Sequence, residues 1–186
     1  YGFSYKYPAE TETKEIVTQS EGNRKVLFAI SNSITGETQK PNTEFYDGYI
    51  FDVVVIEKLP TETISQISNE NISNCREIGE LTKPPEKLIT SETIGITYSC
   101  RTSAEFAHTL FPSPKVNTQY FEIRTFSGGP NYIKYQKTVD QILSTFKFID
   151  PKEMFCGGIA GVVCPEGYRC KYDGDYPDAS GTCITN

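Results

Sequence analysis

The sequence has no tryptophan, one methionine and one histidine among its 186 residues. Any Ser–His–Asp or Cys–His site would therefore have to be built on His108. In the stretch AEFAHTLF, His108 shares one face of a predicted strand with Phe106 and Leu110, which favours a half-buried, structural histidine. We predict that the protein is not an enzyme. A hydrolase that uses His108 with a serine and an aspartate stays open only if His108 is exposed in a cleft.

The sequence also lacks long apolar runs and an excess of basic residues. No stretch approaches the roughly 18 apolar residues that span a bilayer, so we expect no transmembrane segment. No charged and then apolar leader opens the chain, so we expect Tyr1 to be a mature or trimmed start. Asp and Glu outnumber Lys and Arg by 24 to 18, which gives a net charge of −6. Binding to a phosphate backbone needs clustered basic residues, so nucleic acid is not an expected partner.

Cysteine is present in an even number, six, and four of the six follow Pro151. Their C-x7-C-x5-C-x12-C spacing differs from zinc sites, whose ligands usually come in pairs two to four residues apart. The spacing therefore favours disulfides, which persist in oxidising compartments. We predict an exported protein, secreted or held in the cell envelope.

The disulfide pairing is a hypothesis at this level. Of the three connectivities open to the last four cysteines, we favour the interleaved one, which would lock both ends of a small module without a core. It joins Cys156 to Cys170 and Cys164 to Cys183. Cys75 and Cys100 would tie the end of a helix to a strand, with free buried thiols as the alternative.

Apolar periodicity predicts many strands and two helices. The predicted strands cover residues 1–8, 14–20, 25–32, 49–56, 88–90, 93–101, 105–110 and 119–126. One helix is expected from Pro60 to Ile78, with Thr61 or Thr63 available as its N-cap. A second helix is expected from Thr138, with a switch to a closing strand near Ser144. Residues 33–48 and Pro84-Pro85 are expected to form loops.

The predicted fold class is α+β, an antiparallel sheet flanked by helices, followed by a small disulfide-rich C-terminal module. Short connections between most strands favour antiparallel pairing. We expect the larger domain to span residues 1–150 and the cysteine-rich module to span residues 151–186.

Two parts of the chain resemble known kinds of domain. The opening YGFSYKYP and the closing ILSTFKF together resemble the bacterial relatives of the PsbP family. That resemblance implies an antiparallel sheet flanked by helices, and a non-catalytic accessory domain in exported or lipid-anchored proteins. The stretch from Cys156 to Cys183 is similar to small cysteine-rich cassettes appended to predicted secreted proteins of bacteria.

An acidic loop in the module is a candidate calcium site. Asp173, Asp175 and Asp178 lie in KYDGDYPDASG, where glycines let the backbone turn. Spaced carboxylates on a tight loop suit a hard cation such as calcium, and Glu166 could add a ligand. The alternative is a solvated turn whose aspartates cap local backbone amides.

Two functions of different classes follow from these features. The first is an exported, non-catalytic scaffold or binding module, for example a component of a cell-surface or extracellular assembly. It would bind a protein partner or itself through surfaces rich in its 12 tyrosines. The second is a protease inhibitor, in which the loop from Pro165 to Arg169 presents Arg169 to a trypsin-like enzyme.

Overall fold

The structure is a computed structural model in which two compact units can be described, each by itself. One unit is Tyr7–Ser144, and the other joins Tyr1–Lys6 to Thr145–Asn186. This division differs from the expected boundary at residue 150, because a strand near the N-terminus pairs with one that follows Thr145. The described residues are 2–16, 20–21, 24–37, 47–89, 93–114, 116–149, 152, 154–164 and 168–185.

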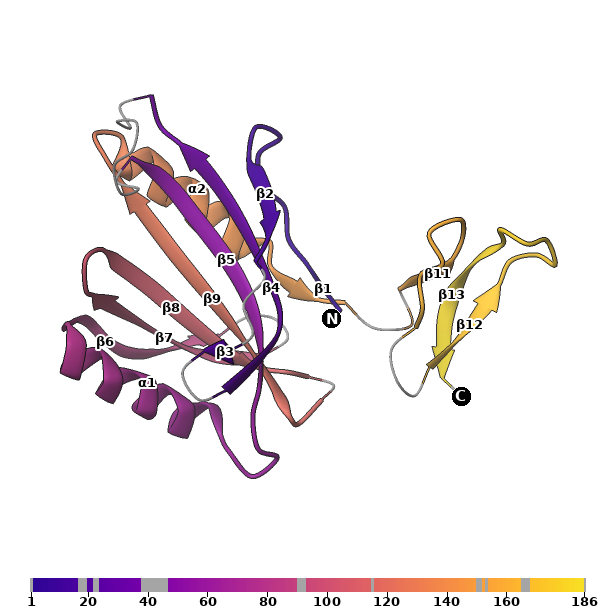
Figure 1. Cartoon of the computed structure of the whole chain (residues 1–186), viewed down its shortest axis with the longest axis horizontal. Helices are drawn as coiled ribbons and strands as arrows, with labels where there is room; N and C mark the ends of the chain where they lie inside the picture. The colour runs from indigo at the N-terminus through magenta and orange to yellow at the C-terminus, as the bar shows by residue number, and fades with distance from the viewer. Residues whose placement is uncertain are drawn as a thin grey trace. The chain divides into compact units, whose positions relative to one another are not determined.

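The larger unit is built on one antiparallel sheet (Figure 1). Its strands are β2 (Glu12–Glu15), β3 (Ser20–Glu21), β4 (Arg24–Thr35), β5 (Gly48–Glu57), β6 (Glu80–Ile89), β7 (Ile94–Arg101), β8 (Glu105–Pro112) and β9 (Gln119–Gly128). The order across the sheet is β2-β4-β5-β9-β8-β7-β6, and β3 pairs with the start of β4. The most apolar strand, β5, therefore lies inside the sheet, as its sequence predicts.

Two helices, α1 (Ile64–Ile78) and α2 (Tyr132–Ser144), pack on this sheet. Helix α1 contacts β6, β7 and β8, whereas α2 contacts β5 and β9. Ile67 and Ile72 of α1 share a buried apolar cluster with Val54 and Ile56 of β5. Because neighbouring residues of a strand point to opposite faces, the intervening β5 residues face the side away from α1. Tyr135 of α2 packs against β5 on that other side, so the sheet is covered on both faces. This explains why β5 is apolar nearly throughout.

The predicted α+β class is wrong, because 51% of the described residues lie in strands and only 18% in helices. The largest local difference is β6, which begins two residues after α1 and includes Pro84 and Pro85, where a loop was expected. A proline removes a backbone donor, which a strand tolerates at the edge of a sheet. β6 is the edge strand, and its pairing with β7 is irregular between Leu81 and Glu86.

The second unit has two small sheets. β1 (Phe3–Ser4) pairs with β10 (Lys147–Phe148), so the opening stretch YGFSYKYP and the stretch ILSTFKF meet. The cysteine-rich module is a three-stranded antiparallel sheet in the order β11-β13-β12. These strands are β11 (Phe155–Gly157), β12 (Tyr168–Tyr172) and β13 (Ser180–Thr185).

Three disulfides join all six cysteines, and none is free. Cys75 at the end of α1 bonds Cys100 of β7, which fastens the helix to the sheet. In the module the pairs are Cys156 with Cys170 and Cys164 with Cys183. These are the pairs that the sequence analysis favoured, and they give the short module covalent links where it has little core. No helix among the described residues is long and apolar enough to cross a membrane.

Candidate functional site

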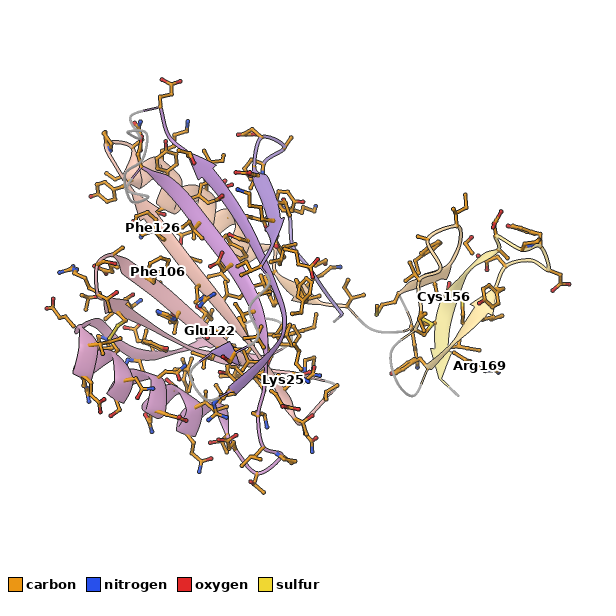
Figure 2. The ribbon with its side chains drawn as sticks, viewed as in Figure 1. Lys25, Phe106, Glu122, Phe126, Cys156 and Arg169 are labelled. Atoms are coloured by element: carbon orange, nitrogen blue, oxygen red, sulfur yellow. A yellow bond between two sulfur atoms is a disulfide. The ribbon has the colours of Figure 1, made fainter. Side chains whose placement is uncertain are left out.

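A cleft of about 520 Å³ lies between α1 and the sheet of the larger unit; we call it the α1 cleft. Its lining comes from α1 and from β4, β5, β7, β8 and β9. Phe106 of β8 and Glu122 of β9 belong to this lining and are labelled in Figure 2. A volume of this size is in the range of small-molecule sites.

Strand register places ionisable side chains in one row along the floor of the α1 cleft. Asp52 of β5 lies opposite Arg124 of β9, and Arg124 lies opposite His108 of β8. His108 in turn lies opposite Tyr98 of β7. Residues directly opposite one another share a face of the sheet, so the row runs across four neighbouring strands. Glu122 joins this row because it lies two residues before Arg124 and faces the same side.

The His108 ring is held on two sides. Its Nδ1 lies 2.8 Å from Oε1 of Glu122, whose side chain is only 4% exposed. The ring also stacks on Tyr98, with centroids 5.0 Å apart and planes 3° apart. An ionised carboxylate can only accept, so toward such a partner Nδ1 is the donor of this bond. His108, with a side chain 19% exposed, lines the α1 cleft.

Asp52 is a buried carboxylate with incomplete pairing. Its Oδ2 lies 3.6 Å from Nη2 of Arg124, and Ser31 bonds the same carboxyl group. Its other oxygen, Oδ1, is buried without a hydrogen-bond partner among the described residues. Burial raises the pKa of Asp52, and the charge of Glu122 adds to the rise, while Ser31 and Arg124 oppose it. The negative charge of Asp52 is therefore costly in this structure.

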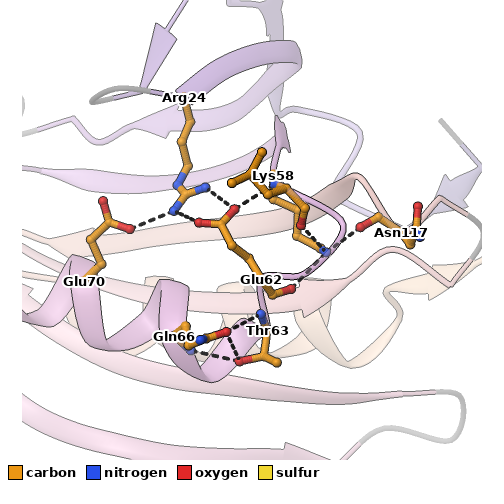
Figure 3. Close-up of polar contacts among 8 residues, drawn as sticks. Arg24, Lys58, Glu62, Thr63, Gln66, Glu70 and Asn117 are labelled. Carbon is orange, nitrogen blue, oxygen red and sulfur yellow. Dashed lines mark hydrogen bonds and ion pairs between the residues drawn. The ribbon is translucent and has the colours of Figure 1, made fainter.

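A second charged group, centred on Arg24 of β4, contributes Arg24 and Glu70 to the lining of the α1 cleft (Figure 3). Arg24 donates from both terminal nitrogens to Glu62 at 2.8 Å, and from one of them to Glu70 at 2.7 Å. Hydrogen bonding by Arg24 lowers the pKa of Glu62 to about 2, and Glu62 in turn raises the pKa of Arg24. Unlike Asp52, these groups are fully paired. Their bonds fasten the first half of α1 to the sheet.

Helix α1 begins beside this group at a capping box. The Thr63 hydroxyl accepts from the backbone N–H of Gln66, and the Gln66 side chain accepts from the backbone N–H of Thr63. Thr63 was one of two N-caps considered from the sequence. The Nζ of Lys58, a side chain that is nearly buried, donates to backbone carbonyls of Leu59, Glu62 and Asn117. The start of α1, the helix that forms one wall of the cleft, is therefore held by several hydrogen bonds.

The structure does not bring the acidic loop together as a metal site. Asp173, Asp175 and Asp178 are all exposed, and they form no cluster of three close ligand atoms. Among the residues that can be described, the single such cluster is Cys156, Cys164 and Cys183. Those three sulfurs belong to disulfides, so they are not thiolate ligands. Glu166, the fourth acidic residue considered, lies outside the described residues.

Arg169, the residue expected in an inhibitory loop, lies in strand β12. It pairs with Ile184 of β13, and its side chain is exposed. Residues 165–167 of the expected loop lie outside the described part of the chain. A residue held in a regular ladder is not the tip of a loop, so this placement does not favour the inhibitor hypothesis.

Sequence reasoning singled out His108 but favoured a half-buried structural role for it, and it missed Asp52, Glu122 and Arg124. A signal was present, because Asp52 interrupts the apolar run YIFDVVVI. A charge in the middle of a buried strand needs a partner or a function. What the sequence could not provide was the strand order that places β8 and β5 on either side of β9.

Comparison with protein-family models, with curated proteins and with solved structures finds no match to this chain. The resemblance to the PsbP family is therefore untested and stays a prediction. The function has to be inferred from the geometry of the α1 cleft alone.

Proposed function

We propose that the protein is an exported, non-catalytic binding module whose larger unit binds a small ligand in the α1 cleft. The observation that carries this proposal is Asp52, a 9% exposed carboxylate that lines the cleft and has one oxygen without a partner among the described residues. Folded proteins pair nearly all buried polar groups, because an unpaired one costs free energy. If the carboxyl group rotates about its Cβ–Cγ bond and presents this oxygen to the cleft, a ligand can donate a hydrogen bond to it. That bond would offset the cost.

Two further features support binding at this position. Aromatic rings of Tyr98, Phe106 and Tyr120 line the cleft beside the ionisable row, and small-molecule sites commonly combine apolar walls with a few polar groups. The wall formed by α1 is fastened at one end by Arg24 and at the other by the Cys75–Cys100 disulfide. A fixed wall lowers the entropy cost of binding, because less of the site has to be ordered when the ligand binds.

Binding is favoured over hydrolysis, although His108 does lie in a cleft. Within the described residues His108 makes one side-chain hydrogen bond, to Glu122. No described serine or threonine hydroxyl is therefore paired with His108 as a nucleophile. All six cysteines are in disulfides. Nucleophilic catalysis needs a hydroxyl or thiol within hydrogen-bond reach of the base.

Export rests on the same disulfides. Three disulfides without a free thiol are typical of proteins that fold in an oxidising compartment. The cysteine-rich module adds a stapled unit, and its role as a docking or display element stays a prediction.

A fragment screen with a blocked variant tests the proposal. Asn74 is exposed on α1 and lines the cleft, so Asn74→Trp places an indole over its opening. Ser73→Trp adds the same ring one residue earlier, at an exposed position outside the lining, and serves as the matched control. We expect ligand-observed NMR to find fragments that bind the wild type and Ser73→Trp but not Asn74→Trp. If every fragment binds Asn74→Trp as well as it binds Ser73→Trp, the proposal fails.

A further inference from the structure

The charges of the α1 cleft are unequally balanced. Arg24 is matched twice, by Glu62 and by Glu70, so its charge is fully compensated within the protein. Asp52 and Glu122 then lie near a single guanidinium, that of Arg124, which is 3.6 Å from Asp52. The floor of the cleft therefore holds two carboxyl groups and one guanidinium, with His108 bonded to one of the carboxyl groups. A cation would correct this imbalance, whereas an anion would enlarge it.

Two carboxyl groups, those of Asp52 and Glu122, are among the polar groups that line the cleft. Asp52 has one oxygen, Oδ1, without a hydrogen-bond partner among the described residues, and Glu122 uses Oε1 for His108. A ligand that satisfies several acceptors at once needs several N–H donors in a fixed arrangement. Planar guanidinium and amidinium groups have this arrangement, whereas an ammonium is a point charge.

Flat walls accompany these acceptors. The rings of Tyr98 and His108 are parallel, and Phe106 lines the same cleft next to them. Phe106 is itself supported by Phe126, at a centroid distance of 5.5 Å. A planar cation can lie against such a face and gain cation–π attraction while its edge donates to carboxylates.

We propose that the α1 cleft binds a planar cationic group, a guanidinium or an amidinium, whose N–H donors reach Glu122 and Asp52. The group belongs either to a small molecule or to an arginine side chain of a peptide, and the chemistry that recognises it is the same. This inference names the ligand class of the proposed function and rests on it.

Calorimetric titration of the full chain with benzamidine tests the class. Benzamide has nearly the same shape without the charge, and benzoate reverses the charge. At low ionic strength we expect benzamidine to bind about tenfold or more tightly than benzamide, and benzoate not to bind, because charge-assisted hydrogen bonds are the stronger kind. Equal binding of benzamidine and benzamide, or tighter binding of benzoate, would overturn the inference.

Carboxyl-to-amide variants locate the interaction. Glu122→Gln and Asp52→Asn keep the side-chain shape and remove one charge each, and we expect each to weaken benzamidine about tenfold. Glu86→Gln is the matched control, because Glu86 is 56% exposed, pairs with Lys83 and lies outside the cleft lining. Circular dichroism and thermal unfolding check that each variant is folded. Unchanged affinity in folded Glu122→Gln and Asp52→Asn would contradict the assignment.

A second arm identifies the source of the cation. Ethylguanidinium is compared with a blocked Gly-Arg-Gly peptide and with its citrulline counterpart, which has the same length and no charge. Tighter binding of the arginine peptide indicates a peptide ligand, and tighter binding of ethylguanidinium indicates a small molecule. Both results support the inference if the citrulline peptide binds less tightly than the arginine peptide. If the citrulline peptide binds as tightly, the inference is contradicted.

The two proposals fail in different ways. If neutral or anionic fragments bind the wild type and are lost in Asn74→Trp, while benzamidine and ethylguanidinium do not bind, the ligand class is wrong and the α1 cleft remains a binding site. If no fragment of any charge depends on Asn74, both proposals fall.

Discussion

Asp52 and Glu62, two carboxyl groups of the larger unit, have pKa values that are shifted in opposite directions. Asp52 is buried with incomplete pairing, and burial raises its pKa above 3.8. Glu62 receives two hydrogen bonds from Arg24, and these lower its pKa from 4.5 to about 2. Their effects on stability must therefore have opposite dependence on pH.

The Asp52→Asn variant should gain stability relative to the wild type as pH rises. Because the folded-state pKa of Asp52 lies above its unfolded value, the folded wild type binds the extra proton, and its stability falls as pH rises above about 3.8. The asparagine does not titrate and escapes this loss. Urea unfolding of both proteins from pH 3 to pH 7 measures the difference. A stability difference that stays constant with pH, or that moves in favour of the wild type, would contradict the raised pKa of Asp52.

The Glu62→Gln variant should behave in the reverse way. Above pH 4.5 the wild type has the full benefit of the Arg24 pair, and we expect the variant to be less stable by about 1.5–3 kcal/mol, the usual contribution of hydrogen bonds to charged groups. As pH falls from 4.5 towards 2, Glu62 is protonated and the advantage disappears. The same urea series measures this. Glu70→Gln is the comparison, because Glu70 is 51% exposed and its loss should cost less.

At the scale of elements, local signals in the sequence predicted some parts of this fold well and others poorly. Thr63 as a helix cap and the apolar run of β5 are local features, and both appear where they were expected. Only the end of β6 was predicted, because Pro84 and Pro85 indicate a loop unless the strand is known to be at an edge. Helix α2 begins at Tyr132, six residues before the expected Thr138, and its buried Tyr135 continues the helical spacing of Val139 and Ile142.

The ionisable row of the α1 cleft could not be predicted from any local signal. Asp52, Arg124 and His108 lie on strands far apart in the sequence, and they meet because β9 lies between β5 and β8. Strand order depends on pairing over long sequence distances, which periodicity does not reveal. The sequence could show that Asp52 was an unusual charge, but not which groups it would face.

Helix α1 should loosen when its disulfide is removed. The Cys75–Cys100 bond closes a loop with a sequence separation of 25, and its loss from Cys75→Ser/Cys100→Ser should cost about 3 kcal/mol. Since α1 is the wall of the cleft, we expect benzamidine to bind more weakly, and the amides of α1 to exchange faster than those of β5 and β9. Hydrogen exchange followed by mass spectrometry measures this. Unchanged protection of α1 would show that packing and the Arg24 pair are sufficient.

At the scale of the whole molecule, the two units depend on different sources of stability. The larger unit has a two-sided sheet with a buried core, whereas the cysteine-rich module has three short strands and two disulfides. Small domains bury too little apolar surface to be stable without such links. Unfolding of the full chain should therefore not be a single transition under reducing conditions.

A variant with serine at Cys156, Cys164, Cys170 and Cys183 should lose the structure of the module alone. We expect amides of β11, β12 and β13 to exchange rapidly, because each disulfide is worth about 2–5 kcal/mol in a small domain. Amides of β5 and β9 should stay as protected as in the wild type. Protection that persists in β13 would contradict the dependence of the module on its disulfides, and loss of protection in β5 would contradict the independence of the larger unit.

The imidazole of His108 is the most direct reporter of the α1 cleft, because it is the only histidine in the sequence and lines the proposed site. Its ring resonances can be followed in a carbon–proton correlation spectrum while benzamidine is added to the full chain. The account predicts that these resonances shift and saturate with the dissociation constant found by calorimetry, and that they do not move in Asn74→Trp. If benzamidine binds while the His108 resonances stay unchanged, the ligand does not occupy this cleft and the central claim is contradicted.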